Sequence, residues 1–318
     1  MTPQALAPVI ARDGERLAFY QWETQAWDPE TGHDALPPHA LILIVHGLGE
    51  HARRYGPLAA LLLNWGFAVC AYDQRGHGDS GGARGVLPHD TVLLEDLADV
   101  MDTLRPPGHA AHAEHAEHSK YSDHASFSGS TEPLPLILLG HSLGGLVASR
   151  FVALKMRPVQ GLVLSSPALT MRLSTLQKCL LAVMQRLAPD WPVGNGLDTR
   201  YLSHDEHVVR NYQLDPRVHD RISARLARFM ASAGPDTQAA ASNWQVPTLL
   251  LYAGADRLVD PDGSRVFAQN AAEAVERSAM RAGVVTARCF DGLYHELFNE
   301  RDSAPVFIAL KTWLDARF

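Results

Sequence analysis

A glycine-flanked serine near the middle of the chain has the sequence pattern of a catalytic nucleophile. Residues 140–144 read GHSLG, which fits the pattern Gly-x-Ser-x-Gly. A strand-like run, LPLILL, precedes the segment, and a helix-like run, LVASRFVAL, follows it. A sharp turn between strand and helix favours small residues and leaves the serine exposed near the positive end of the helix dipole. The pattern therefore predicts that Ser142 attacks a carbonyl carbon.

An acid and a base that would activate Ser142 are expected further along the chain, in that order. Asp256 and His295 each follow a late apolar run, where a strand is expected to end. Position singles out His295 among the 16 histidines of the chain. Asp260 and Asp262 share a loop with Asp256 but lie further from the strand end, and Asp262 is expected to cap the next helix. We predict Asp256 as the acid, with Asp260 as the alternative.

Acyl transfer also needs two backbone N–H groups that stabilise the developing oxyanion. One is expected from Leu143, the residue that follows the nucleophile. The other is expected from residues 46–49, HGLG, which follow the early apolar run LILIV. The glycines there would let the backbone approach a substrate closely.

The elements that would position these groups alternate between short apolar runs and helix-length segments. The runs are rich in Val, Ile and Leu, which is typical of strands buried on both faces of a parallel sheet. They cover residues 41–45, 67–72, 136–139, 159–164, 248–252 and 284–290. Helical spacing of apolar residues marks residues 53–64, 90–104 and 143–155. The alternation predicts an α/β fold, with a mostly parallel, doubly wound sheet covered by helices on both faces.

Two segments interrupt this alternation. Residues 107–132 are rich in His, Ala, Ser and Glu, and we expect a surface loop whose histidines are solvated rather than bound to a metal. Residues 167–244 contain no strand-like run and are expected to form a helical cap. Residues 1–166 and 245–318 would then be the two parts of one α/β core.

The expected cap contains apolar residues at spacings of three and four, which predicts one continuous apolar helix face from Leu169 to Leu187. This face could bind a substrate, pack the cap onto the core, or do both. The candidate substrate-binding residues are Leu169, Leu173, Leu176 and Leu180.

Several further blocks occur in a fixed order along the chain. They are HGLGEH at 46–51 with Arg54 and Tyr55, DQRGHGDS at 73–80, SSP at 165–167, GADRLVD at 254–260 and YHE at 294–296. We interpret the block at 73–80 as a turn that supports the catalytic loops. Together with GHSLG, the blocks resemble the monoacylglycerol lipase and lysophospholipase branch of the α/β-hydrolases, whose profiles overlap with serine aminopeptidase-like members. The resemblance spans most of the chain, is looser in the cap and leaves out residues 107–132.

This resemblance implies a carboxylic ester hydrolase acting on single-chain lipids, either monoacylglycerols or lysophospholipids, through an acyl-enzyme on a Ser-His-Asp triad. It also implies that the amide of Leu48 is the second oxyanion donor, and it implies no metal or organic cofactor. Two alternatives use the same triad: a carboxylesterase for small esters and an aminopeptidase-type amide hydrolase. Dehalogenases and epoxide hydrolases of this fold carry an aspartate nucleophile, which Ser142 argues against.

Composition limits the partners and the location. The 318 residues carry a formal net charge of −7 without a run of Lys or Arg, so nucleic acid is not an expected partner. The N-terminus lacks a signal-peptide pattern, and the apolar runs fall short of the about 20 residues that span a bilayer. We expect a cytoplasmic protein without stable membrane insertion; transient contact with a membrane surface and the oligomeric state stay open. Cys70, Cys179 and Cys289 are expected to be reduced and buried.

Overall fold

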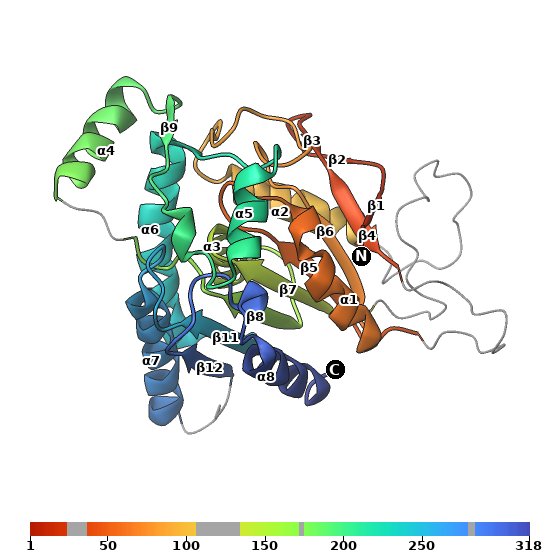
Figure 1. The fold of residues 1–318 in the computed structure, drawn as a ribbon. Helices are drawn as coiled ribbons and strands as arrows, with labels where there is room; N and C mark the ends of the chain where they lie inside the picture. Colours follow the sequence, from red (N-terminus) through yellow and green to blue (C-terminus); the bar gives the residue numbers. More distant parts are fainter. Residues whose placement is uncertain (24–36, 106–133, 172–174, 279–283) are drawn as a thin grey trace, which may run out of the picture.

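The computed structural model describes residues 1–23, 37–105, 134–171, 175–278 and 284–318. Its centre is an eight-stranded sheet with the strand order β1-β4-β6-β5-β7-β8-β11-β12 (Figure 1). The strands from β6 to β12 pair in parallel, whereas β4 and β1 add antiparallel strands at one edge. The mostly parallel sheet confirms the predicted α/β fold.

The six predicted strands form the parallel part of the sheet. They are β5 (Leu41–Val45), β6 (Ala68–Tyr72), β7 (Leu136–His141), β8 (Gly161–Ser165), β11 (Thr248–Ala253) and β12 (Val285–Phe290). The first five are buried throughout, as expected for strands covered on both faces. The expectation of full burial is wrong for β12, which lies at the edge of the sheet and is partly exposed.

Four short N-terminal strands are not predicted from the sequence. They are β1 (Gln4–Ala5), β2 (Val9–Ile10), β3 (Arg16–Leu17) and β4 (Phe19–Trp22). Strands of two to four residues are too short to show a hydrophobic period, so the sequence alone cannot distinguish them from a loop.

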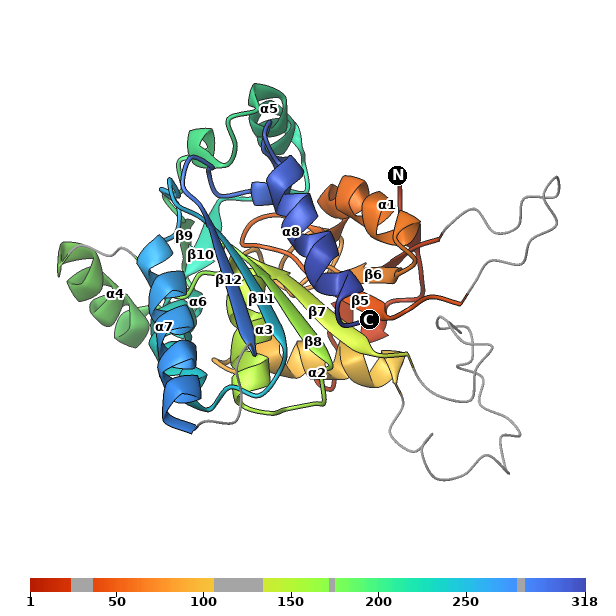
Figure 2. The same ribbon diagram turned by 90° about the horizontal axis from the view of Figure 1, so that it is seen from below.

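Helices cover both faces of the sheet (Figure 2). On one face lie α1 (Gly56–Asn64) and α8 (Ala304–Asp315), and on the other lie α2 (Val92–Leu104), α3 (Leu143–Ala153) and α7 (Pro261–Ser278). Alternate side chains of each strand point to the two layers. In β5, for example, Ile42 and Ile44 pack with α1 and α8, whereas Leu43 and Val45 pack with α2 and α3. The helices α1, α2 and α3 confirm the three predicted in the first half of the chain.

Between β8 and β11 the chain forms the inserted segment. Its elements are α4 (Thr175–Leu187), β9 (Pro192–Gly194), η2 (Thr199–Tyr201), α5 (Glu206–Leu214), β10 (Arg221–Ser223), α6 (Ala224–Ala240) and η3 (Ala241–Asn243). In Figure 1 the helix α4 lies at the outer edge of the molecule, beyond α6. The segment is mostly helical, as predicted, but β9 and β10 pair as a short antiparallel ribbon. The boundaries at 166/167 and 244/245 stay predictions.

The structure corrects the single apolar face predicted for the insertion. Leu169 lies before the helix and is fully buried in the main core, because the chain leaves β8 directly into the sheet's helix layer. The helix itself begins at Thr175, and Leu180 and Leu187 on it are 58% and 79% exposed. Residues of one pattern are therefore divided between the core and a solvent-facing helix.

Further expectations concern the burial of the cysteines, membrane-spanning helices and the segment 107–132. Cys70 is buried as expected, but Cys179 on α4 and Cys289 on the edge strand β12 are exposed, so the predicted burial of these two is wrong. No helix in the described part of the chain is both long enough and apolar enough to cross a membrane. The surface loop predicted at 107–132 lies outside the described residues, as does Leu173.

Candidate active site

Ser142 lies on the sharp turn between β7 and α3, as predicted. Its backbone has φ 51° and ψ −118°, a conformation that is unusual for a residue with a side chain. The turn is held because the amide of Ser142 donates to the carbonyl of Ser165 and its carbonyl accepts from Ala168, each at 3.0 Å. Glycine is needed nearby, since a Cβ at Gly144 would lie 2.0 Å from the carbonyl oxygen of Val45. The side chain of Ser142 is partly exposed.

Asp256 and His295 form a buried pair. The distance from His295 Nδ1 to Asp256 Oδ2 is 2.6 Å, and the two residues are 4% and 5% exposed. Asp256 Oδ1 accepts from the amides of Leu258 and Val259 at 2.8 and 3.0 Å, so both carboxylate oxygens are fixed. Because Nδ1 is occupied by the carboxylate, Nε2 is the ring nitrogen left for other chemistry.

The charges of this pair reinforce each other. Burial alone would raise the pKa of Asp256, but the charge and hydrogen bond of His295 outweigh it and lower that pKa. Burial alone would lower the pKa of His295, but the charge and hydrogen bond of Asp256 outweigh it and raise that pKa. The carboxylate therefore favours the protonated form of the imidazole over the form it would take if buried alone.

The rival carboxylates have other partners. Asp260 Oδ1 accepts from the amide of Asp262 at 3.1 Å, at the start of α7. Asp260 therefore caps this helix, and the expectation that Asp262 does so is wrong. The carboxylate that contacts His295 is that of Asp256.

The pair lies next to the elbow that carries Ser142. The ring of His295 is 4.7 Å, centroid to centroid, from the ring of His141, which precedes Ser142 in the chain. His141 is itself held, because its Nδ1 lies 3.1 Å from the carbonyl oxygen of Ser165. The structure thus places the pair of Asp256 and His295 beside the residue that precedes Ser142.

The loop at 46–49 also lies against the elbow. A Cβ added at Gly47 would lie 3.2 Å from the Cβ of Ser142. Gly49 has φ +77°, and a Cβ there would lie 2.3 Å from the carbonyl oxygen of His219. Within the described residues, the amides of Leu48 and Leu143 donate no hydrogen bond. The two amides lie at the positions from which the sequence predicts the oxyanion donors.

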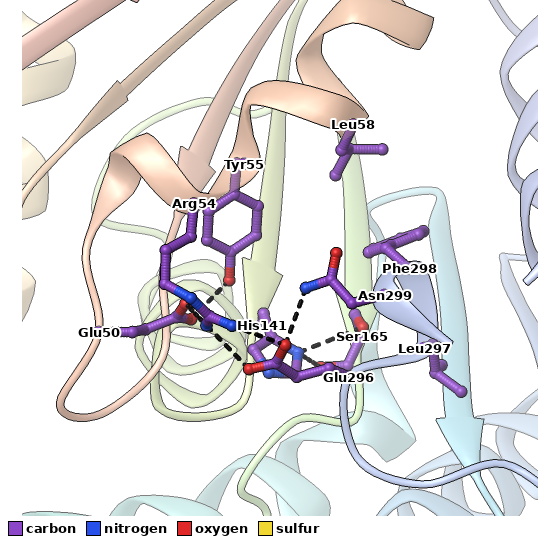
Figure 3. Close-up of a pocket in the computed structure, with 10 residues that line it drawn as sticks. All are labelled: Glu50, Arg54, Tyr55, Leu58, His141, Ser165, Glu296, Leu297, Phe298 and Asn299. Carbon is purple, nitrogen blue, oxygen red and sulfur yellow. Dashed lines mark hydrogen bonds and ion pairs between the residues drawn. The ribbon is translucent and has the colours of Figure 1, made fainter. Parts of the chain in front are cut away.

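A buried charge cluster beneath the elbow is not predicted from the sequence (Figure 3). Arg54 donates two hydrogen bonds of 2.8 Å to the carboxylate of Glu296 and a third bond to Glu50. Glu50 also accepts from the amide of Gly47 at 2.6 Å and from Tyr55 Oη at 2.7 Å. Burial alone would raise the pKa of Glu50, but the charges of Arg54 and the nearby histidines and the hydrogen bond from Tyr55 together outweigh it and lower the pKa to about 2. The cluster joins the loop of Leu48 to the residue after His295.

The block at 73–80 supports this arrangement. Asp73 accepts hydrogen bonds from Tyr20 Oη at 2.9 Å and from the amides of Ala52 and Asp79, each at 2.8 Å. Because these contacts tie neighbouring loops together, the block fits its interpretation as a supporting turn.

A cavity of ≈ 420 Å³ lies between α4 and α6. Its wall is mainly apolar and consists of Thr170, Met171, Leu181, Ala182, Gln185, Met230, Ala231 and Pro235. Of the predicted substrate-binding residues, Leu169 is buried in the main core and Leu180 points to solvent. Leu176 lies on α4, and Leu173 lies outside the described residues. The helix therefore presents to the cavity a face other than that of Leu180.

The chain is similar to known hydrolases over most of its length. The model of a family described as serine aminopeptidase, S33, matches residues 36–302. The monoacylglycerol lipase of Mycolicibacterium smegmatis is 32% identical over 292 residues, which is 91% of this chain and 90% of that protein. The phospholipase YtpA of Bacillus subtilis is 30% identical, over 87% of this chain and 96% of that protein. The crystal structure of the monoacylglycerol lipase of Paleococcus ferrophilus is 30% identical, covers 88% of this chain and 96% of its own, and superposes with a TM-score of 0.70.

Proposed function

The chain belongs to the monoacylglycerol lipase-like α/β-hydrolases and is a carboxylic ester hydrolase, and we propose that it acts on single-chain lipids. The nucleophile is Ser142, the base is His295 and the acid is Asp256. The observation that carries the proposal is the buried 2.6 Å contact between Asp256 and His295 beside the elbow of Ser142. A carboxylate in that position holds the imidazole in one tautomer and stabilises its charged form.

The reaction proceeds in two halves. Ser142 Oγ attacks the ester carbonyl carbon while His295 Nε2 takes its proton, and the oxyanion is held by the amides of Leu48 and Leu143. The carbon–oxygen bond to the alcohol then breaks, and the alcohol leaves with the proton from His295. Water enters, gives a proton to His295 and attacks the acyl carbonyl carbon. The bond from that carbon to Ser142 Oγ then breaks, His295 returns the proton to Ser142, and the fatty acid is released.

The cavity between α4 and α6 supports a lipid as the acyl donor. Its volume of ≈ 420 Å³ falls in the range of small-molecule sites, and its wall is largely apolar. It adjoins Met171, which follows closely on Ala168, the residue hydrogen-bonded to Ser142. An acyl chain in this cavity would gain about 0.8 kcal/mol for each methylene removed from water. Relatives named monoacylglycerol lipase and phospholipase support the same substrate class.

A substrate panel tests this proposal. We expect kcat/KM for p-nitrophenyl esters to rise with acyl length by up to about fourfold per methylene until the cavity is filled. Monoolein and lysophosphatidylcholine should be hydrolysed, and an aminoacyl anilide should be slower by at least about 100-fold. Ser142→Ala is the matched blank for each substrate. A profile that peaks at acetate would assign a small-ester carboxylesterase, and a preference for the anilide would assign an aminopeptidase; either would overturn the lipid proposal.

A further inference from the structure

Three consecutive amides hold the loop that carries His295. The amide of Tyr294 donates to Glu300 Oε1 at 2.6 Å. The amide of His295 donates to the carbonyl of Tyr201 at 3.4 Å, and the amide of Glu296 donates to the carbonyl of Leu202 at 2.8 Å. The backbone around His295 is therefore fixed by Glu300 on one side and by residues 201–202 of the inserted segment on the other.

Glu300 also fixes the inserted segment at this point. Its Oε1 lies 2.9 Å from His204 Nδ1, and its Oε2 accepts from the amide of His204 at 3.0 Å and from Ser203 Oγ at 3.4 Å. The ring of His204 stacks on the ring of Tyr294, with centroids 3.6 Å apart and planes inclined by 19°. Glu300 is 5% exposed, whereas the side chain of His204 is 41% exposed, so the carboxylate is buried and the imidazole covers it at the surface. One carboxylate thus joins residues 203–204 to the residue before His295.

We propose that Glu300 is a positioning residue for His295, which clamps the base loop to residues 201–204 so that the imidazole stays aligned between Asp256 and Ser142. The inference rests on the proposed triad. Glu300 touches neither the substrate nor the reacting atoms. Its effect on catalysis follows from geometry, because a displacement of about 1 Å at a catalytic group can reduce the rate by about 100-fold.

A purely structural role predicts a different outcome. Asp96 offers a matched control, because it is 1% exposed, is paired with Arg75 through bonds of 2.9 and 2.7 Å, and lies on α2 away from the base loop. If Glu300 contributes only to folding, then Glu300→Gln and Asp96→Asn should both lower the melting temperature and leave the turnover of each folded molecule unchanged.

Glutamine and alanine at position 300 should have graded effects. Glutamine keeps one carbonyl oxygen for the amide of Tyr294 but replaces the other acceptor with a donor that faces the amide of His204 and the hydroxyl of Ser203. Alanine keeps neither. We expect kcat on p-nitrophenyl butyrate to fall about 10-fold in Glu300→Gln and about 100-fold in Glu300→Ala, with KM within about threefold of wild type.

His204→Ala provides a second variant that leaves Glu300 in place. It removes the stacking on Tyr294 and one of the hydrogen bonds, and we expect kcat to fall about threefold to 10-fold. Because both residues act through one contact, the double variant Glu300→Gln/His204→Ala should be close to Glu300→Gln alone rather than the product of the two effects. The single variant His204→Ala also tests the proposal if the substitutions at position 300 prevent folding.

The experiment measures kcat and KM for each variant, with active sites counted by titration with a fluorophosphonate, beside melting temperatures. The proposal predicts lowered kcat per titrated site in Glu300→Gln and His204→Ala and an unchanged kcat in Asp96→Asn. An unchanged kcat per titrated site in Glu300→Gln or, if that variant does not fold, in His204→Ala would overturn it. So would equal losses in Asp96→Asn. Failure of the triad itself would appear differently, as wild-type enzyme that hydrolyses ester without labelling at Ser142.

Discussion

The charges around His295 give this residue a higher pKa than its neighbour His141. Three carboxylates surround His295: those of Asp256, Glu296 and Glu50. Burial alone would lower the pKa of His295, but these charges outweigh it and raise the pKa above the usual value of 6.5. Burial and the charge of His295 lower the pKa of His141 to about 4. Of the two, His295 therefore takes up a proton at the higher pH, which fits its proposed role as the general base.

Activity should consequently be lost in mild acid. Protonated His295 cannot accept the proton of Ser142, so kcat/KM should fall as the pH drops through a midpoint above 6.5. In Glu296→Gln a charge that raises the pKa of His295 is removed, and the midpoint should move to lower pH. The measurement is pH-stat hydrolysis of a short ester between about pH 5 and pH 9. Asp315→Asn on the surface of α8 is the control, and a midpoint that stays in place in Glu296→Gln would contradict the electrostatic account.

The positions of the proposed triad residues at the ends of strands could be predicted from the sequence, but the contacts that hold them could not. Ser142, Asp256 and His295 each follow a recognisable apolar run, so position along the chain identifies them. The contact of Arg54 with Glu296 joins residues 242 positions apart, and that of His204 with Glu300 joins residues 96 positions apart. No local spacing encodes such pairs, because they arise only when the loops are brought to one edge of the sheet.

At the level of elements, hydrophobic period predicts long buried strands well and the inserted helices poorly. The strands β5 to β8 and β11 are covered on both faces, so nearly every side chain in them is buried and apolar. An uninterrupted apolar run in the sequence therefore predicts such a strand. The spacing of Leu169 to Leu187 suggested a single helix face, yet Leu169 belongs to the core and Leu180 faces solvent. The spacing of apolar residues indicates that a helix could form, but it does not show at which residue the helix begins or against which surface it packs.

The cavity between α4 and α6 gives a prediction for these two helices. Ala182→Trp would fill part of the cavity, so an acyl chain could bury fewer methylenes. We expect kcat/KM for a p-nitrophenyl palmitate to fall about 10- to 100-fold, while the value for the butyrate stays within about threefold. Ala239→Trp, exposed on α6 and outside the cavity wall, is the matched control. Equal losses on both esters would show that the cavity does not hold the acyl chain.

At the scale of the whole molecule, the inserted segment is joined to both sides of the site. On one side His219 donates its amide to the carbonyl of Gly49 at 2.9 Å, and His51 Nε2 lies 2.9 Å from Asp215 Oδ2. On the other side residues 201–204 hold the loop of His295. The middle of the insertion is thus attached to the loops of the core, whereas α4 lies outward beside the cavity (Figure 1). The same chain segment therefore forms one wall of the cavity and contacts the loops of the proposed catalytic site on both sides.

The central claim, that Ser142 is the nucleophile of an acyl-enzyme, is tested most directly by mapping the residue modified by a fluorophosphonate. The protein is labelled to complete loss of esterase activity, digested and analysed by mass spectrometry. We predict one modified residue, Ser142, with labelling and loss of activity proceeding at the same rate, and no labelling in Ser142→Ala. Modification of another serine that accounts for the lost activity, or full labelling of Ser142 with activity retained, would contradict the account.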